Sequence, residues 1–278
     1  MTEDIKNKLL QIKHVALDMD GTIYMENNIF PFTLPFLAKL RSLGITYSFL
    51  TNNPTKSLDD YLAKLSRMGI VAEREQMYST VPATIDYIKT HLPAVKKLFL
   101  LGTPSMISQF EDAGFTSTAD SAEDVPDAVV VAFDTTLVYS RLCRAAWWVS
   151  QGLPYLATNP DKVCPTDQPT VLVDCGSLCK CIEYATGRKP DVTIGKPDPA
   201  MLAGIEGRYG LTPSQIAMVG DRIYTDVEMA YNAGAFGVLV LSGETTLEVA
   251  KAWPHAPSLI CRDIEELGNL LEEAHGSC

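Results

Sequence analysis

The stretch Asp18-Met19-Asp20-Gly21-Thr22 follows the apolar run His14-Val15-Ala16-Leu17 and decides the fold. An apolar run of this kind is typical of a buried strand in an α/β protein. Because side chains alternate along a strand, Asp18 and Asp20 would project from one face at its carboxyl end, where open α/β sheets bind their ligands. Two neighbouring buried carboxylates repel each other, so the pair predicts a divalent cation.

A calcium-binding loop is the main alternative for Asp-x-Asp followed by glycine. In that loop glycine is the sixth residue and glutamate the twelfth. Here glycine is the fourth, at Gly21, and the twelfth residue is Ile29. We therefore interpret the stretch as a phosphoryl-transfer site. One carboxylate would attack phosphorus and the other would transfer protons, while Gly21 and Thr22 supply the turn and donors to the phosphate oxygens.

Three further motifs follow in order, each after an apolar run: Phe49-Leu50-Thr51-Asn52-Asn53, Gly195-Lys196-Pro197-Asp198-Pro199, and Val219-Gly220-Asp221-Arg222 with Thr225-Asp226. With these four motifs the chain resembles the haloacid dehalogenase (HAD) superfamily of hydrolases, and within it the NagD-like, p-nitrophenyl-phosphatase branch. The resemblance implies an α/β fold, namely a doubly wound parallel sheet with a Rossmann-like HAD core and an inserted α/β cap domain.

The resemblance also implies catalytic roles. Asp18 would be the nucleophile, forming an aspartyl-phosphate, and Asp20 the general acid and base. The hydroxyl of Thr51 would hold the transferring phosphoryl group, and Lys196, at the opening of a helix, would neutralise its charge. Taken singly, each residue has an ordinary structural interpretation, for example a helix cap for Thr51. Their joint occurrence favours the catalytic one.

The metal expected from the resemblance is Mg²⁺. Asp18, the backbone carbonyl of Asp20 and Asp221 would be its protein ligands, because Mg²⁺ prefers a few hard oxygen ligands with water and phosphate. Asp226 is expected just outside this ligand set, where it would hold a ligand water or orient Lys196.

Four more residues are candidates for substrate binding. Asn52 and Asn53 are expected near the phosphate, although Pro54 stands where many relatives have a small polar residue, which puts that contact in doubt. Asn159 and Asp161 would line the substrate pocket from the cap. Asn-Pro-Asp is also a frequent turn sequence, so these two have an equally good interpretation as turn formers.

The spacing of the motifs predicts two domains. Thr51 and Lys196 are 145 residues apart, whereas a βα step needs roughly 30 to 40 residues. The surplus shows its own alternation of strand and helix patterns, with strands expected at 98–101, 128–133, 155–157 and 170–173. We therefore predict a catalytic core formed by 1–80 and 191–278, with an α/β cap inserted at 81–190.

Composition limits the classes of binding partner and the cellular compartments that we expect for this protein. A net charge of −11 argues against nucleic acid and anionic membranes as partners. No apolar run approaches the roughly 18 residues of a membrane span, and the start is not a basic signal peptide, so a cytoplasmic location is expected. Seven cysteines, an odd number, suggest reduced thiols. A zinc site at Cys175, Cys179 and Cys181 would lack an evident fourth ligand.

The sequence thus predicts a magnesium-dependent phosphatase hydrolysing small phosphate monoesters, such as a sugar phosphate, a nucleotide or a similar metabolite. Two alternatives stay open: a phosphotransferase or mutase on the same core, and a catalytically silent metabolite-binding protein. The expected partners are a small phosphorylated metabolite and a second copy of the chain, as a homodimer through the cap.

Overall fold

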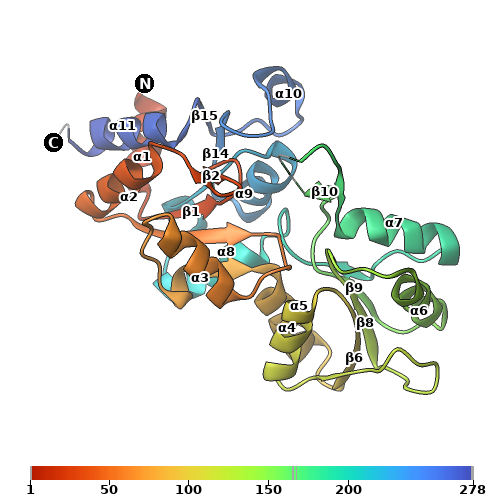
Figure 1. Cartoon of the computed structure of the whole chain (residues 1–278). Helices are drawn as coiled ribbons and strands as arrows, with labels where there is room; N and C mark the ends of the chain where they lie inside the picture. Colours follow the sequence, from red (N-terminus) through yellow and green to blue (C-terminus); the bar gives the residue numbers. More distant parts are fainter. Residues whose placement is uncertain (1, 165, 167, 277–278) are drawn as a thin grey trace. The chain divides into compact units, whose positions relative to one another are not determined.

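The computed structural model describes residues 2–164, 166 and 168–276, and they form two compact units (Figure 1). The first, called the core unit here, comprises the described residues of 1–50, 62–78 and 196–278. The second, called the cap unit, comprises the described residues of 51–61 and 79–195. Each is an α/β unit with its own sheet, as predicted from the alternating strand and helix patterns.

The core unit is built on a six-stranded sheet with the strand order β15-β14-β13-β1-β4-β5. Its strands are β1 (His14–Asp18), β4 (Thr46–Thr51), β5 (Met77–Ser79), β13 (Ile216–Gly220), β14 (Phe236–Val240) and β15 (Leu259–Cys261). Strand β1 is parallel to both its neighbours, with Leu17 opposite Phe49 and Val219. The carboxyl ends of β1 and β13 therefore lie at the same edge of the sheet, which brings the first and fourth motifs together.

Helices cover this sheet because their apolar side chains pack against those of its strands. The helices α8 (Ala200–Tyr209) and α9 (Glu228–Ala233) bury Met201, Ile205 and Met229 against strand residues such as Ala16 and Met218. The helix α11 (Ile264–His275) packs against both α1 (Glu3–Gln11) and α2 (Thr33–Ser42). The other helical segments with residues in the core unit are α3 (Leu58–Arg67), α10 (Leu247–Ala252), η1 (Arg74–Gln76), η2 (Pro213–Gln215) and the π-helix η3 (Ile223–Val227).

A short hairpin follows the first motif. Strands β2 (Tyr24–Met25) and β3 (Asn28–Ile29) pair antiparallel, with Met25 opposite Asn28, so the turn is Glu26-Asn27. Glu26 adopts a positive φ of 50°, a conformation that a two-residue hairpin connection requires at its first position.

The cap unit has a five-stranded sheet with the order β12-β9-β8-β6-β7. Its strands are β6 (Lys97–Leu101), β7 (Thr116–Ser117), β8 (Ala128–Val131), β9 (Tyr155–Ala157) and β12 (Val192–Thr193). One face is covered by α4 (Thr80–His91) and α5 (Pro104–Asp112), and the other by α6 (Tyr139–Ser150) and α7 (Cys175–Thr186). The segment 170–173, expected as a strand of this alternation, is instead part of a separate hairpin. There β11 (Leu172–Val173) pairs antiparallel with β10 (Val163–Cys164).

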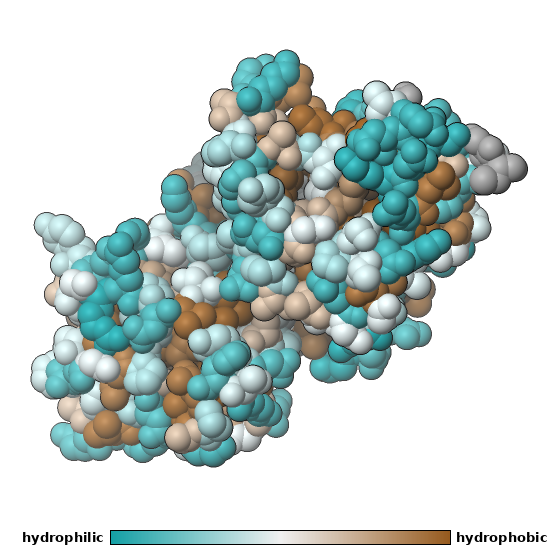
Figure 2. Space-filling view, turned by 180° about the vertical axis from the view of Figure 1, so that it is seen from behind, coloured by the Kyte–Doolittle hydropathy of each residue, from teal (hydrophilic) through white to brown (hydrophobic). Residues whose placement is uncertain are grey.

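The surface is mainly hydrophilic on the face shown in Figure 2, with smaller apolar patches between the polar side chains. None of the helices in the described part of the chain has the length and apolarity needed to span a bilayer. The six described cysteines, at 143, 164, 175, 179, 181 and 261, are free thiols.

Candidate active site

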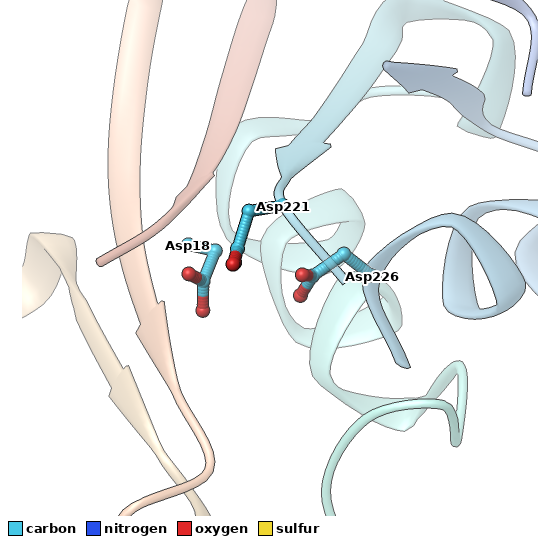
Figure 3. Close-up of side chains that lie close together, drawn as sticks. All are labelled: Asp18, Asp221 and Asp226. Carbon is cyan, nitrogen blue, oxygen red and sulfur yellow. The ribbon is translucent and has the colours of Figure 1, made fainter. Parts of the chain in front are cut away.

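Three carboxylates meet at the carboxyl edge of the core sheet (Figure 3). Asp18 ends β1, Asp221 directly follows β13, and Asp226 lies in the π-helix η3. Each offers a carboxylate oxygen that lies within 4.8 Å of those of the other two. All three side chains are buried, and Asp226 is completely inaccessible to solvent. The parallel register of β1 and β13 thus joins residues that are about 200 positions apart in the chain.

Lys196 supplies the positive charge in contact with this cluster. Its ammonium forms an ion pair with Asp18 and another with Oδ1 of Asp226 at 2.7 Å. Burial alone would lower the pKa of Lys196, but the two carboxylates outweigh it and raise the pKa above its usual value. The ammonium is therefore charged at any physiological pH, and it can neutralise an anion at this edge.

The expectation that Lys196 opens a helix is wrong, because α8 begins only at Ala200. Lys196 precedes Pro197, and Asp198 precedes Pro199. A residue before proline is disfavoured in the α-helical region, so two such positions delay the start of the helix. Lys196 reaches the carboxylates from a turn that precedes the helix.

The cluster is short of positive charge. Burial raises the pKa of Asp221 to about 8, and the charges of Asp18 and Asp226 act in the same direction. Oδ2 of Asp221 accepts a hydrogen bond from the backbone N–H of Glu244 at 2.7 Å. Its Oδ1 is buried and has no hydrogen-bond partner among the residues that the structure describes. Such an oxygen, beside two further carboxylates, fits a hard divalent cation such as Mg²⁺.

Three glycines allow the backbone to lie directly against these side chains. A Cβ atom on Gly21 or Gly243 would overlap the carboxylate of Asp221, and one on Gly220 would overlap that of Asp226. Gly21 also has a φ of 87°, which side chains rarely tolerate. The glycine in the first motif is therefore required by the packing of the acids as well as by the turn.

The loop 242–245, after β14, is a part of the site that the sequence analysis missed. The backbone N–H groups of Glu244 and Thr245 donate to Oδ2 and to the backbone oxygen of Asp221, the second at 3.2 Å. The hydroxyl of Ser242 donates to the backbone oxygen of Gly21 at 2.7 Å. The available signal was a Ser-Gly pair soon after an apolar strand, at the edge where the other motifs end.

The turn after Asp18 uses its own hydrogen-bond donors. The N–H of Gly21 donates to the backbone oxygen of Tyr24 at 2.8 Å, and the hydroxyl of Thr22 to Oδ2 of Asp18 at 3.3 Å. Binding of phosphate by these two groups stays a prediction, and it would compete with the bonds of the turn. Burial raises the pKa of Asp20 above its ordinary value, and the charge of Lys64 opposes this shift.

The second motif forms a closed turn in the cap unit. The hydroxyl of Thr51, the last residue of β4, accepts a hydrogen bond from the N–H of Asn53 at 3.1 Å. Oδ1 of Asn53 accepts from the N–H and the hydroxyl of Thr55 at 3.0 and 2.6 Å. Pro54 is thus enclosed in a turn stabilised by side chains, while Thr51 and Asn52 are both buried.

The predicted cap residues Asn159 and Asp161 follow β9 and are also buried. The amide nitrogen of Asn159 donates to Oδ2 of Asp161 at 3.1 Å and to Oδ1 of Asp174 at 2.9 Å. Its amide oxygen accepts from the hydroxyl of Thr158 at 2.9 Å. The Asn159 amide is thereby engaged within the cap unit, and a contact of either residue with substrate stays a prediction.

Comparison with known proteins gives consistent matches over nearly the whole chain. Residues 15–116 match the family model of haloacid dehalogenase-like hydrolases, and 193–267 match a HAD-hydrolase-like model. The ribonucleotide monophosphatase NagD of Escherichia coli K12 is 30% identical, over 93% of this chain and 99% of its own.

Two solved structures extend the comparison. A 4-nitrophenylphosphatase from Thermotoga maritima superimposes with a TM-score of 0.87 at 37% identity, covering 94% of this chain and 98% of its own. A glycerol phosphate phosphatase from Mycobacterium tuberculosis, solved in complex with magnesium, gives 0.85 at 28% identity, covering 94% and 78%.

Proposed function

The chain belongs to the haloacid dehalogenase-like hydrolases, in their NagD-like branch, and from this membership we propose that it is a magnesium-dependent phosphatase acting through an aspartyl-phosphate. Its relatives are phosphatases, and the chain is accordingly a phosphoric monoester hydrolase. The proposed substrates are small phosphate monoesters, namely sugar phosphates, nucleotides or similar metabolites. Two of the relatives are named for ribonucleotide and glycerol phosphate substrates.

The observation that carries the proposal is the buried cluster of Asp18, Asp221 and Asp226, with Lys196 bridging two of them. A carboxylate of Asp18 would attack phosphorus in line with the leaving oxygen, forming a bond to phosphorus as the ester bond breaks. The ammonium of Lys196 would turn from Asp18 to the phosphoryl oxygens and stabilise their charge.

Asp20 would move the protons. In the first step its carboxyl group would give a proton to the leaving alkoxide. In the second it would take a proton from water, which attacks phosphorus and releases Asp18 and inorganic phosphate. The raised pKa of Asp20 supports this role, because it increases the fraction of the carboxyl group that carries a proton at a given pH.

The residues that would hold Mg²⁺ are Asp18, the backbone carbonyl of Asp20, and Asp221, with Asp226 beside them. When bound, the ion would supply positive charge that allows the phosphate dianion to approach the carboxylates. The orphaned oxygen of Asp221 and the excess of acidic groups support this assignment.

The test measures phosphate release from p-nitrophenyl phosphate and from a panel of phosphorylated metabolites. Removal of divalent metal by chelation should abolish release and added Mg²⁺ should restore it, whereas Ca²⁺ should substitute poorly because its coordination is larger and more variable. Full activity after exhaustive chelation would refute the metal dependence. Adding an alcohol as a competing acceptor separates hydrolysis from phosphotransfer, since a transferase would form the new ester.

The homodimer through the cap and the cytoplasmic location are further proposals. The six free thiols of the described cysteines support a reducing compartment. Light scattering on the purified protein measures the first, and fractionation of cells the second.

A further inference from the structure

A buried lysine outside the four motifs lies close to the catalytic turn. Lys64 belongs to the part of α3 (Leu58–Arg67) within the core unit, and only 6% of its surface is exposed. Lysine is rarely buried to this degree, because removing its charge from water costs several kcal/mol unless other groups offset it. The position therefore needs a reason beyond the packing of the helix.

The first partner of Lys64 is an aromatic ring. Its ammonium lies 3.7 Å from the centroid of the Tyr24 ring, which is completely buried. This is a cation–π contact in a desolvated place, where such contacts are strongest. Tyr24 is the first residue of the short hairpin that follows the first motif, so its contact with Lys64 helps to fix the position of that hairpin.

Tyr24 in turn is tied to Asp20. The two residues form a backbone bridge, and the backbone oxygen of Tyr24 accepts from the N–H of Gly21. Lys64 therefore contacts the residue that fixes the backbone of Asp20 and Gly21. The positive charge of Lys64 also acts on the Asp20 carboxyl group.

We propose that Lys64 is a positioning residue for proton transfer: its ammonium, packed on the Tyr24 ring, holds in place the turn that carries Asp20, so that the Asp20 carboxyl group can reach the leaving oxygen. The inference rests on the proposed phosphatase mechanism. In that step the proton passes from the Asp20 carboxyl to the leaving oxygen, the ester bond to phosphorus breaks, and the bond from Asp18 to phosphorus forms. Loss of Lys64 would leave the Asp20 carboxyl group less well oriented.

The choice of substrate separates this role from a structural one. A p-nitrophenolate leaves with little help from an acid, whereas the alkoxide of glycerol phosphate needs a proton. The quantity to compare is kcat/KM, which depends only on the steps up to and including the first irreversible one, taken here as formation of the aspartyl-phosphate. Asp20 also acts in the later hydrolysis of this intermediate, but that step does not affect kcat/KM.

We expect Lys64→Met to lower kcat/KM for glycerol phosphate by about 100-fold, the lower end of the usual contribution of general acid catalysis, and for p-nitrophenyl phosphate by less than about 3-fold. Lys64→Arg should recover most of the loss, because a guanidinium also stacks on an aromatic ring. Tyr24→Leu, which removes the ring on which the ammonium packs, should show the same selectivity as Lys64→Met. Arg67→Met, an exposed position on the same helix, is the matched control and should change neither substrate.

Equal losses on both substrates, or no loss on glycerol phosphate, would overturn the proposal. If Lys64→Met does not fold, as judged by its circular dichroism, the pair Lys64→Arg and Tyr24→Leu carries the test. In that case equal losses on both substrates in Tyr24→Leu would overturn it. Failure of the phosphatase proposal itself would look different, because the wild-type protein would then release no phosphate from either ester.

Discussion

The core and cap units each bury a cluster of acidic side chains, but they balance the charge in different ways. In the core unit, Asp18 and Asp226 share the ammonium of Lys196, and an oxygen of Asp221 has no hydrogen-bond partner among the described residues. In the cap unit, the amide of Asn159 bridges two carboxylates by hydrogen bonds. A neutral amide thus bridges the two acids of the cap cluster, whereas a cation bridges two acids of the core cluster and leaves Asp221 outside the pair, where the proposed Mg²⁺ would bind.

The largest effect should come from removing the nucleophile. Asp18→Asn keeps the size of the side chain but abolishes its charge, so turnover of p-nitrophenyl phosphate should fall at least about 1,000-fold, or about 4 kcal/mol in activation free energy. Steady-state assays measure this, with a thermal melt to show that the variant is folded. Residual activity above about a tenth of wild type would exclude a covalent mechanism. The core cluster would then lose the catalytic role that sets it apart from the cap cluster.

The second effect concerns pH and the opposite, amino-terminal edge of the core sheet. The hydroxyl of Thr46 donates to the backbone oxygen of Lys13, so it accepts from Nδ1–H of His14 at 2.8 Å. Burial lowers the pKa of His14 to about 4. The unfolded chain therefore binds this proton more tightly than the folded one. Stability from this group is complete above pH about 6.5 and is lost as the pH falls towards 4, by roughly 3 kcal/mol.

Comparing wild type with His14→Gln isolates this contribution from that of the carboxylates. Denaturant unfolding at pH 7 and at pH 4, with Mg²⁺ present, gives the two free energies of unfolding. The wild-type protein should lose about 3 kcal/mol more than the variant over this range. Parallel pH profiles would show that His14 is not the acid-sensitive group of the core.

The third effect tests whether the cap cluster is structural. Asn159→Ala removes the donor shared by Asp161 and Asp174, so the free energy of unfolding should fall by about 2 kcal/mol. If the same residues also contact the leaving group, the order of metabolites by kcat/KM will change, with p-nitrophenyl phosphate affected least. Asp161→Ala provides the second measurement. An unchanged order for both variants would make them turn formers only.

The smallest effect has the opposite sign and occurs in the core. Without metal, Asp221→Asn should raise the free energy of unfolding by about 1 kcal/mol, since it removes a charge from a crowded, buried site. The pKa of Asp221 is raised to about 8, so its ionisation costs stability as the pH rises from about 4 towards 8. The advantage of the variant should therefore grow over that range and disappear when Mg²⁺ is added. Destabilisation of the metal-free variant would mean that the two clusters are alike.

The fold and the acidic cluster could be predicted because each motif is local: an apolar strand ends and a carboxylate follows. Parallel strands then bring Asp18 and Asp221 together without further information. Other contributions are not visible locally. Glu244 acts through its backbone N–H, which every residue except proline possesses. Lys64 looks like an ordinary helix lysine until the ring of Tyr24 is placed over it, and the delayed start of α8 depends on two prolines acting together.

The three glycines pressed against the carboxylates have a consequence for how this protein can evolve. At positions 21, 220 and 243 even a single methyl group would collide with Asp221 or Asp226. Those acids cannot change shape independently of the main chain that surrounds them. Substitutions that change substrate specificity should therefore accumulate outside this edge of the sheet. The three glycines and the two acids should be kept together, because none of them can be replaced alone. A saturation library at the three positions would return almost only the parental residue among active clones.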